Sequence, residues 1–486
     1  MNLTEPIRRV ARDRPSDPAV VDGDRVYTFR DLWSSIGHMA RRLTARGLQP
    51  GDRVLIWLPN GAGFLAAHFG AMVAGLLSVP SKAENGPAEL EFIQADSRPR
   101  LLITSRELLA RLPGGPPPDL DCLIPDEVLP GVDPLDVTPE EVPGDHPASV
   151  IYSYVFGEGR AYGAVLTHAN HYYNGVFNAP FFRVDPGDRI MIALPMLHVF
   201  PMGMGILPAF YQGGTIYCGD ALRPRTLLET MSRERITHFP CVPQVFEQLT
   251  RGYRPDRYDL SAVKNLTSGA DFLPEEIHRS FQETLGAPVI QGYGMTETFP
   301  TVCNPPDERN RPGTLGISVH ERIRYRILDP AGRELPPGQV GEIEMQGPCN
   351  MFGYLDAPEA TARMIHDGWM RSGDIGWVDD QGYLRFERLQ KPIINLSGNK
   401  VDPLEVARVI ERCPGVGAAR VSALVTTADG SLPSVAIKAE IELEPGAQLE
   451  DRDIRAHCRT WLASYKVPQK LELRSNGHGR RADQSP

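Results

Sequence analysis

Short apolar runs rich in β-branched residues alternate with helical patterns through most of this chain. Arg53–Leu58 has the composition of a buried strand, and Phe64–Pro80 is typical of a buried helix that runs into a second strand. Leu101–Thr104 and Ile190–Leu194 repeat the strand pattern. Strands that are separated by helices lie parallel and need crossover connections, so the alternation predicts an α/β fold with parallel sheets.

The pattern changes twice towards the C-terminus. From about Ile323, shorter strands with Gly and Pro turns predict a small β-rich module. After Arg388, a helix predicted at Pro403–Arg412 followed by strand, strand and helix predicts an α+β unit. For 486 residues we expect a large N-terminal domain of two α/β sheet subdomains plus the β-rich module, a hinge, and a small mobile α+β C-terminal domain. The expected limits are 1–387, 388–391 and 392–486.

Composition argues against several classes of protein. Hydrophobic residues make up 41% and charged residues 23%, which is ordinary for a globular chain, and a net charge of −10 argues against nucleic acid or an anionic membrane as the main partner. We see no secretory signal and no apolar run long enough for a membrane span. The seven cysteines are scattered without a C-x-x-C pair, so we expect no metal site, no disulfide framework and a cytoplasmic location.

The sharpest motif is the octapeptide Gln291–Thr298. A strand predicted at Pro288–Ile290 runs into a Gly-flanked turn that presents the aromatic Tyr293, the hydroxyl of Thr296 and the carboxylate of Glu297. An aromatic ring can stack on a base, a hydroxyl can bind a phosphate, and a carboxylate can bind a divalent ion. A purely structural turn could use the glycines, but it would not need the whole set.

This octapeptide resembles the adenine- and phosphate-binding signature of the adenylate-forming (ANL) superfamily, which includes acyl-CoA synthetases, peptide-synthetase adenylation domains and luciferases. Blocks along nearly the whole chain resemble other conserved parts of that superfamily: Tyr27–Leu32, Pro50–Val54, Leu58–Asn60, Leu194–Phe200, Ser268–Ala270, Trp369–Asp374 and Ser397–Pro403. The resemblance implies two half-reactions. A carboxylate first attacks the α-phosphate of ATP; the C-terminal domain then rotates about the hinge, and the thiol of coenzyme A attacks the acyl carbon and releases AMP.

The resemblance also implies roles for individual residues. The expected AMP-binding set is Gly269, Ala270, Gly292, Tyr293, Thr296, Asp374 and Arg388. The expected catalytic group is Thr296, Glu297 and His198, and Lys391, Ser397 and Gly398 are expected at the hinge and the CoA entry. Two interpretations of His198 carry equal weight: a gate of the pocket, or a buried and hydrogen-bonded histidine.

The first departure from the superfamily pattern lies in the phosphate loop. Val155, Phe156 and Glu158 stand where the superfamily has a run of small hydroxyl residues, and Tyr162 replaces its lysine. A triphosphate cradle uses backbone N–H groups, hydroxyls and a cation, so a carboxylate would repel the β- and γ-phosphates. We therefore expect a degraded loop. The alternative is a shifted alignment in which Arg160 substitutes for the lysine.

The second departure lies at the C-terminus. Tyr465–Pro468 matches the superfamily, but the Gly-Lys that normally follows, whose lysine contacts the carboxylate and the α-phosphate during adenylation, is missing. No lysine follows Lys470, and Arg480 is the nearest counterpart. Arginine keeps the charge, but its planar fork does not replace a compact ammonium at a crowded phosphorus centre. Compositional drift in a lysine-poor chain is the alternative explanation.

Both departures fall on the adenylation half-reaction. We therefore expect a non-adenylating acyl-CoA synthase that takes a preformed acyl-adenylate from a separate adenylating enzyme, transfers the acyl group to CoA and releases AMP, with no need for Mg²⁺. The pattern is similar to that of the non-adenylating acyl-CoA synthases of platensimycin/platencin-type diterpenoid biosynthesis, which implies a bulky diterpenoid acid and a role in natural-product biosynthesis. A monomer or a homodimer is expected.

Three alternatives stay open at this stage. The chain could be a conventional ATP-dependent carboxylic acid–CoA ligase, or a catalytically silent acyl-adenylate-binding protein. Aromatic and methionine side chains in 171–182 and 200–210 could line a bulky acyl pocket or belong to the core. They are Tyr172, Tyr173, Phe177, Phe181, Phe182, Met202 and Met204.

Overall fold

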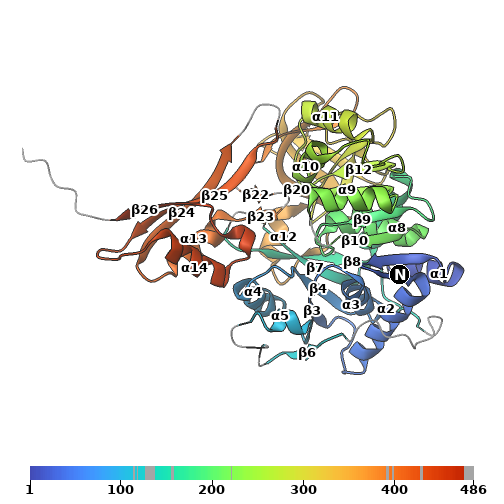
Figure 1. Ribbon diagram of the computed structural model, residues 1–486, viewed down its shortest axis with the longest axis horizontal. Coiled ribbons are helices and arrows are strands. Elements are labelled where there is room, and N and C mark those ends of the chain that lie inside the picture. Colours follow the sequence, from blue (N-terminus) through green and yellow to red (C-terminus); the bar gives the residue numbers. More distant parts are fainter. Residues whose placement is uncertain are drawn as a thin grey trace, which may run out of the picture.

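The computed structural model describes residues 1–112, 115, 117, 119–125, 137–154, 158–219, 222–389, 393–396, 399–426 and 431–475. Figure 1 shows a large N-terminal part built of sheets covered by helices, and a smaller C-terminal α+β part that projects from one side of it. The predicted mixed α/β fold class is confirmed.

A seven-stranded sheet forms the first α/β layer of the N-terminal part, in the order β18-β8-β7-β4-β3-β5-β6. Its strands are β3 (Arg53–Trp57), β4 (Leu77–Ser81), β5 (Leu101–Thr104), β6 (Asp121–Leu123), β7 (Pro147–Ser153), β8 (Tyr162–Thr167) and β18 (Gly353–Tyr354). β3 is parallel to both β4 and β5, and α3 (Ala62–Val73) connects β3 to β4. The buried helix and strand predicted within Phe64–Pro80 are therefore confirmed.

A nine-stranded sheet forms the second layer, in the order β15-β14-β13-β12-β11-β9-β10-β1-β2. Its strands are β1 (Pro18–Asp22), β2 (Arg25–Thr28), β9 (Arg189–Ile192), β10 (Thr215–Cys218), β11 (His238–Cys241), β12 (Asn265–Ser268), β13 (Val289–Met295), β14 (Phe299–Cys303) and β15 (Ile317–Ser318). β13 is longer than predicted, because after its parallel pairing with β12 it continues antiparallel to β14. Tyr293 therefore lies on a strand and not in a turn.

The β-rich module is an antiparallel sheet of β16 (Arg324–Leu328), β17 (Gly341–Gln346), β19 (Ile365–His366), β20 (Trp369–Val378) and β21 (Leu384–Leu389). β20 pairs with β21, and this register sets Asp374 opposite Leu389 and Ile375 opposite Arg388. The module thus carries two predicted AMP-binding residues on adjacent strands.

The C-terminal part has its own hydrophobic core, which includes Val406, Ile410, Ile437, Ile441 and Ile454. Its elements are the hairpin of β22 (Ile394–Leu396) and β23 (Asn399–Val401), the sheet of β24 (Val416–Thr426), β25 (Ser434–Leu443) and β26 (Lys470–Ser475), and the helices α13 (Pro403–Glu411), α14 (Asp451–Trp461) and η3 (Ser464–Lys466). A separate core identifies this part as a small domain. Its limits and the hinge at 388–391 stay a prediction, and Lys391 lies outside the described residues.

The remaining helices pack on the N-terminal sheets. They are α1 (Glu5–Asp13), α2 (Phe29–Thr44), α4 (Pro87–Ser97), α5 (Arg106–Leu109), α6 (His168–Phe181), α7 (Val199–Pro201), η2 (Met202–Ile206), α8 (Leu207–Gln212), α9 (Pro224–Arg233), α10 (Pro243–Gly252), α11 (Glu275–Leu285) and α12 (Pro358–Met364). Within the described ranges, none of the helices has the length and apolar character that crossing a bilayer requires.

Candidate active site

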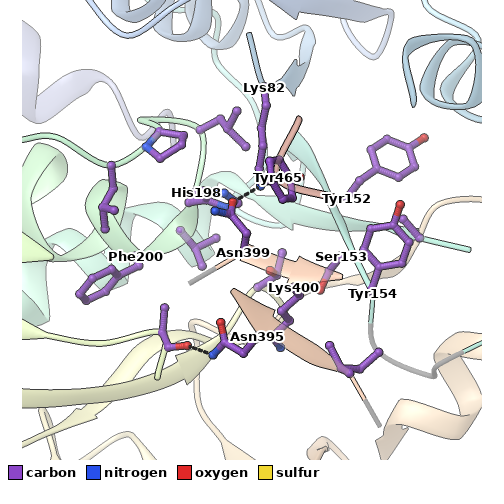
Figure 2. A pocket seen from close by; sticks show the side chains of 18 of the residues that line it. Lys82, Tyr152, Ser153, Tyr154, His198, Phe200, Asn395, Asn399, Lys400 and Tyr465 are labelled. Atoms are coloured by element: carbon purple, nitrogen blue, oxygen red, sulfur yellow. Dashed lines mark hydrogen bonds between the residues drawn. The ribbon is translucent and has the colours of Figure 1, made fainter. Parts of the chain in front are cut away.

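A cleft of about 1180 Å³ lies between the N-terminal sheets and the C-terminal domain. Its wall combines residues after β4, residues of β13 and β20, the β22–β23 hairpin and η3, so both domains contribute to it. Figure 2 shows labelled side chains from the segment after β4, from the end of β7, from the β22–β23 hairpin and from η3 around the cleft. A concave site at a domain boundary, with convergent polar groups, is the usual position of a ligand-binding site.

Two predicted AMP-binding residues meet in this cleft although they are 81 positions apart. The Tyr293 hydroxyl donates a hydrogen bond to Asp374 Oδ2 at 2.8 Å. Burial raises the pKa of Asp374, and the charge of Lys400 opposes that shift. Gly292, Thr296 and Ala270 line the same cleft. The arrangement offers an aromatic face, a hydroxyl and a half-buried carboxylate to one ligand.

Two other residues of the predicted AMP set are placed differently. Gly269 is buried under the Phe200 ring, where an added Cβ would lie 2.6 Å from a ring carbon, so glycine is needed for this close approach. Arg388 is exposed on β21 beside the strand that carries Asp374, and it does not contribute to the cleft wall. Gly269 therefore supports the wall from behind, and Arg388 lies at its edge.

Glu297 is fully buried in the cleft wall. The Tyr354 hydroxyl donates to Glu297 Oε1 at 3.0 Å, and Oε2 has no hydrogen-bond partner among the residues that the structure describes. Burial raises the pKa of Glu297, and the charge of Lys400 lowers it again. A lone carboxylate fits Mg²⁺ only when phosphates and water complete the coordination. The described part of the chain holds no cluster of three or more potential metal ligands.

His198 lines the cleft, and its Nε2 has no hydrogen-bond partner within the described ranges. Burial, assisted by the charge of Lys82, holds the pKa of His198 well below its ordinary value, so the ring is neutral. This environment favours a role at the cleft over that of a buried histidine whose hydrogen bonds are all satisfied.

The described part of the altered phosphate loop is occupied by a carboxylate network. The Tyr162 hydroxyl donates to Glu158 Oε2 at 2.6 Å, and Arg363 pairs with Glu158 Oε1 at 2.8 Å. Arg160 lies over the Tyr162 ring at 4.5 Å and is 3.4 Å from Asp96. Tyr162, which the family resemblance aligns with a lysine, thus holds a carboxylate. Val155 and Phe156 lie outside the described residues.

The same loop binds the C-terminal domain. Asp402 Oδ2 accepts from the backbone N–H of Gly159 at 2.7 Å, and Arg408 donates to the carbonyls of Gly159 and Glu158 at 2.9 and 3.1 Å. Gly159 has a φ of +72°, and a Cβ added there would lie 2.9 Å from Leu404 Cβ. The close packing of α13 on the loop therefore depends on this glycine.

A buried ion cluster also joins the two domains. Lys466 is 2% exposed; it is 2.8 Å from Glu405 Oε1 on α13 and 3.2 Å from Glu89 Oε1 on α4. The Tyr154 hydroxyl donates to the same Glu405 oxygen at 2.6 Å. Lys466 thus pairs with one carboxylate from each domain.

The β22–β23 hairpin reaches into the cleft (Figure 2). Asn395 donates to the carbonyl of Ala270 at 2.7 Å, and Asn399 Oδ1 accepts from Lys82 at 2.7 Å. Sequence reasoning assigned no role to Lys82, Asn395, Asn399 or Lys466. Three features of the sequence could have drawn attention to some of these residues: the scarcity of lysine, the Ser397–Pro403 block and the Tyr465–Pro468 block. Ser397, Gly398 and Arg480 lie outside the described residues.

The structure does not support the acyl-pocket interpretation of the aromatic and methionine side chains in 171–182 and 200–210. Phe177, Phe182, Met202 and Met204 are buried in the N-terminal core, and none of the seven residues contributes to the cleft wall. Tyr172, Tyr173 and Phe181 pack against that core. Their helices α6 and η2 pack against each other, which turns these side chains inward.

Comparison with known proteins identifies the family. A model of the AMP-binding enzyme family matches residues 7–355, which is most of the chain. The chain belongs to this AMP-binding, adenylate-forming family of acyl-CoA synthetases. Over 482 residues it is 31% identical to a feruloyl-CoA synthase of an Amycolatopsis species, with 96% of this chain and 94% of the relative covered.

Two solved structures of one enzyme, the o-succinylbenzoate CoA synthetase of Bacillus subtilis, share the fold of this synthetase-family chain at 23% identity. A double mutant bound to the product analogue OSB-NCoA superposes with a TM-score of 0.84 and covers 98% of this chain and 96% of its own. The complex with AMP superposes with a TM-score of 0.72, with 96% and 94% covered.

Proposed function

We propose that this acyl-CoA ligase performs only the second half-reaction of its family: it transfers the acyl group of a preformed acyl-adenylate to coenzyme A and releases AMP. The observation that carries the proposal is the bonded Tyr162–Glu158–Arg363 network in the phosphate loop. A cradle for β- and γ-phosphates needs free N–H groups and a cation. Here a carboxylate occupies the loop, and Arg363 is already paired with it.

The packing of the C-terminal domain supports the same proposal. Asp402 and Arg408 bind the backbone of Gly159 and Glu158, so the C-terminal domain covers the loop on which the polyphosphate of ATP would have to lie. The two Bacillus subtilis structures come from one enzyme at 23% identity to this chain, and they superpose on it with different TM-scores. The better superposition is with the form that holds a CoA product analogue, which favours a domain arrangement suited to thioester formation.

The chemistry proposed for the cleft needs little beyond binding and orientation. The acyl-adenylate already contains an activated acyl–phosphate bond, so the thiol needs only the correct approach to the acyl carbon and a stabilised AMP leaving group. We assign Tyr293, Thr296 and Asp374 to the AMP portion, and His198 to the boundary between the adenylate and the incoming thiol. Glu297 orients the Thr296 segment in this scheme, and no step requires Mg²⁺.

The acyl group is proposed to be bulky and apolar, of the diterpenoid type, and a separate cytoplasmic enzyme is proposed to supply its adenylate. The cleft is larger than the roughly 300–1,000 Å³ of ordinary small-molecule sites. Apolar side chains, including Leu58, Phe64, Leu194, Leu197 and Phe200, contribute to its wall. Such a wall favours a large hydrocarbon skeleton beside the adenylate.

A second candidate function is a conventional ATP-dependent acid–CoA ligase. It is favoured by the similarity to the feruloyl-CoA synthase over almost the whole length of both chains. In that case Arg160, which contributes to the cleft wall, would have to replace the missing loop lysine.

Nucleotide binding separates the two candidates. We expect isothermal titration calorimetry to show that ATP binds no more tightly than AMP and that Mg²⁺ changes neither affinity, because the phosphate loop carries the Glu158 carboxylate and the neighbouring Arg363 is already paired with it. Glu158→Gln is the matched variant, since it keeps the hydrogen bond to Tyr162 but removes the charge, and it should improve ATP binding relative to AMP. Binding of Mg²⁺–ATP to the unmodified chain about tenfold tighter than AMP would favour the conventional ligase.

A further inference from the structure

Lys82 lies in the cleft wall, and none of the roles assigned above uses it. It follows directly after β4, and its ammonium nitrogen donates to Asn399 Oδ1 at 2.7 Å and to the Tyr465 hydroxyl at 3.3 Å. The same nitrogen is 4.9 Å from the centre of the Tyr465 ring. Figure 2 shows Lys82 beside His198 at the boundary of the two domains. Two residues of the C-terminal domain therefore hold Lys82 in place.

These two contacts leave one position on the nitrogen open. An ammonium has three N–H donors, of which Asn399 and Tyr465 accept two. Among the described residues no further hydrogen-bond partner of Lys82 Nζ is found. In the neutral amine the third position is a lone pair, which can accept a proton from a group in the cleft.

The other cations of the cleft wall are unsuited to accepting a proton. Arg160, Arg408 and Arg412 stay protonated, because a guanidinium does not lose its proton in proteins. Lys466 is paired with Glu405 and Glu89, and the carboxylates and tyrosines around it raise its pKa well above the ordinary value despite its burial. Its charge is therefore permanent at neutral pH.

His198 and Lys400 are equally unsuited. The pKa of His198 lies so far below its ordinary value that the ring is a much weaker base than a thiolate. The positive charge of Lys400 stabilises the ionised forms of Glu297 and Asp374. Among the lysine, arginine and histidine side chains in the described part of the cleft wall, Lys82 is therefore the remaining candidate base.

The charges around Lys82 come from several elements. Burial, followed by the positive charge of Lys466 on η3, lowers the pKa of Lys82 to about 8, and the carboxylates Glu84, Glu89 and Glu405 oppose the shift. Tyr465 and the neutral His198 also face it. The thiol of cysteine has an ordinary pKa of about 8.5. An amine whose pKa lies near that of a thiol can accept the thiol proton, as general base catalysis requires.

We propose that Lys82 accepts the thiol proton of coenzyme A as the sulfur attacks the acyl carbon. The S–C bond forms, the bond between the acyl carbon and the phosphate oxygen breaks with its electron pair leaving on AMP, and the proton passes from sulfur to the Lys82 amine and then to water. This assignment rests on the thioester-forming step of the proposed function, which the conventional ligase would share.

The test is single-turnover formation of acyl-CoA from a synthetic acyl-adenylate, of ferulic acid or of a polycyclic diterpenoid acid, whichever the wild-type chain uses faster. We expect Lys82→Arg and Lys82→Met to be about 10²-fold slower at pH 7. The deficit should shrink about tenfold or more by pH 9.5, because the thiol then ionises without a base. Acyl-adenylate affinity should change less than about threefold. Lys264→Arg, on the surface and paired with Asp185 and Asp188, is the matched control.

Three results would overturn the assignment. A Lys82→Arg variant as fast as the wild type would show that only the positive charge matters. A deficit of the same size at every pH would show that Lys82 only supports the packing of Asn399 and Tyr465. An absence of acyl-CoA from the wild-type chain with either acyl-adenylate would contradict the proposed function itself, and Lys82 would have no thiol to deprotonate. If the wild-type chain forms acyl-CoA, the thioester-forming step of the proposed function holds, and the results with the Lys82 variants then test the role of Lys82 alone.

Discussion

Lys466→Met is expected to lower the rate of acyl-CoA formation by about 10²-fold or more. Removing one partner of a buried ion pair costs about 3–5 kcal/mol, because the remaining charge is left buried without compensation. Here the change leaves two carboxylates without this partner, Glu89 in the N-terminal domain and Glu405 in the C-terminal domain. The contact between the two domains is therefore destabilised. The binding of acyl-adenylate to Tyr293 and Asp374 should persist.

The measurement compares steady-state acyl-CoA formation with the dissociation constant of the acyl-adenylate. Lys470→Met is the matched control: Lys470 is 51% exposed and pairs only with Glu472 of the same domain at 3.2 Å among the described residues. An exposed pair of this kind contributes about 0–1 kcal/mol, so the control should keep nearly full activity. Equal rates for both variants would show that the buried cluster is not needed for the active domain arrangement.

Asp374→Ala is the second change with a large expected effect. The family resemblance assigns this carboxylate to the ribose hydroxyls, and hydrogen bonds to a charged group contribute about 1.5–3 kcal/mol each. Losing two of them should weaken acyl-adenylate binding about 10²- to 10⁴-fold, with a similar fall in kcat/KM. Calorimetric titration with AMP is the simplest measurement.

The matched control for Asp374→Ala is Tyr162→Phe. This change removes the hydroxyl that donates to Glu158 but keeps the ring, which packs 5.4 Å from the Tyr354 ring. Because we assign no role in AMP binding or thioester formation to the phosphate loop, the control should stay within about threefold of wild type. A strong loss with Tyr162→Phe together with a small loss with Asp374→Ala would contradict the assignment of the two sites.

Local elements could be predicted closely from the sequence. The strand predicted at Arg53–Leu58 is β3 at Arg53–Trp57, and the helix predicted at Pro403–Arg412 is α13 at Pro403–Glu411. These elements follow from apolar periodicity and from end signals such as Asp402, which caps α13. The extension of β13 to Met295 could not be predicted in this way, because it depends on pairing with β14.

The candidate site also combines contacts that the sequence predicted with contacts that it could not predict. The meeting of Tyr293 and Asp374 was expected from family resemblance and not from any local pattern. The contacts of Lys82, Asn399 and Lys466 were not expected, because they exist only where two separately folded domains meet. A sequence pattern reports which face of one element is buried, but it does not report how one domain packs against another.

Acyl-CoA formation, followed by mass spectrometry in two parallel reactions, tests most directly whether the chain performs only the second half-reaction. One contains free acid, ATP, Mg²⁺ and coenzyme A, and the other contains the synthetic acyl-adenylate and coenzyme A, with ferulic acid and a polycyclic diterpenoid acid as the two acyl groups. We expect acyl-CoA only in the reaction that receives the adenylate. Acyl-CoA from free acid and ATP at a comparable rate would contradict this expectation and identify a conventional ligase.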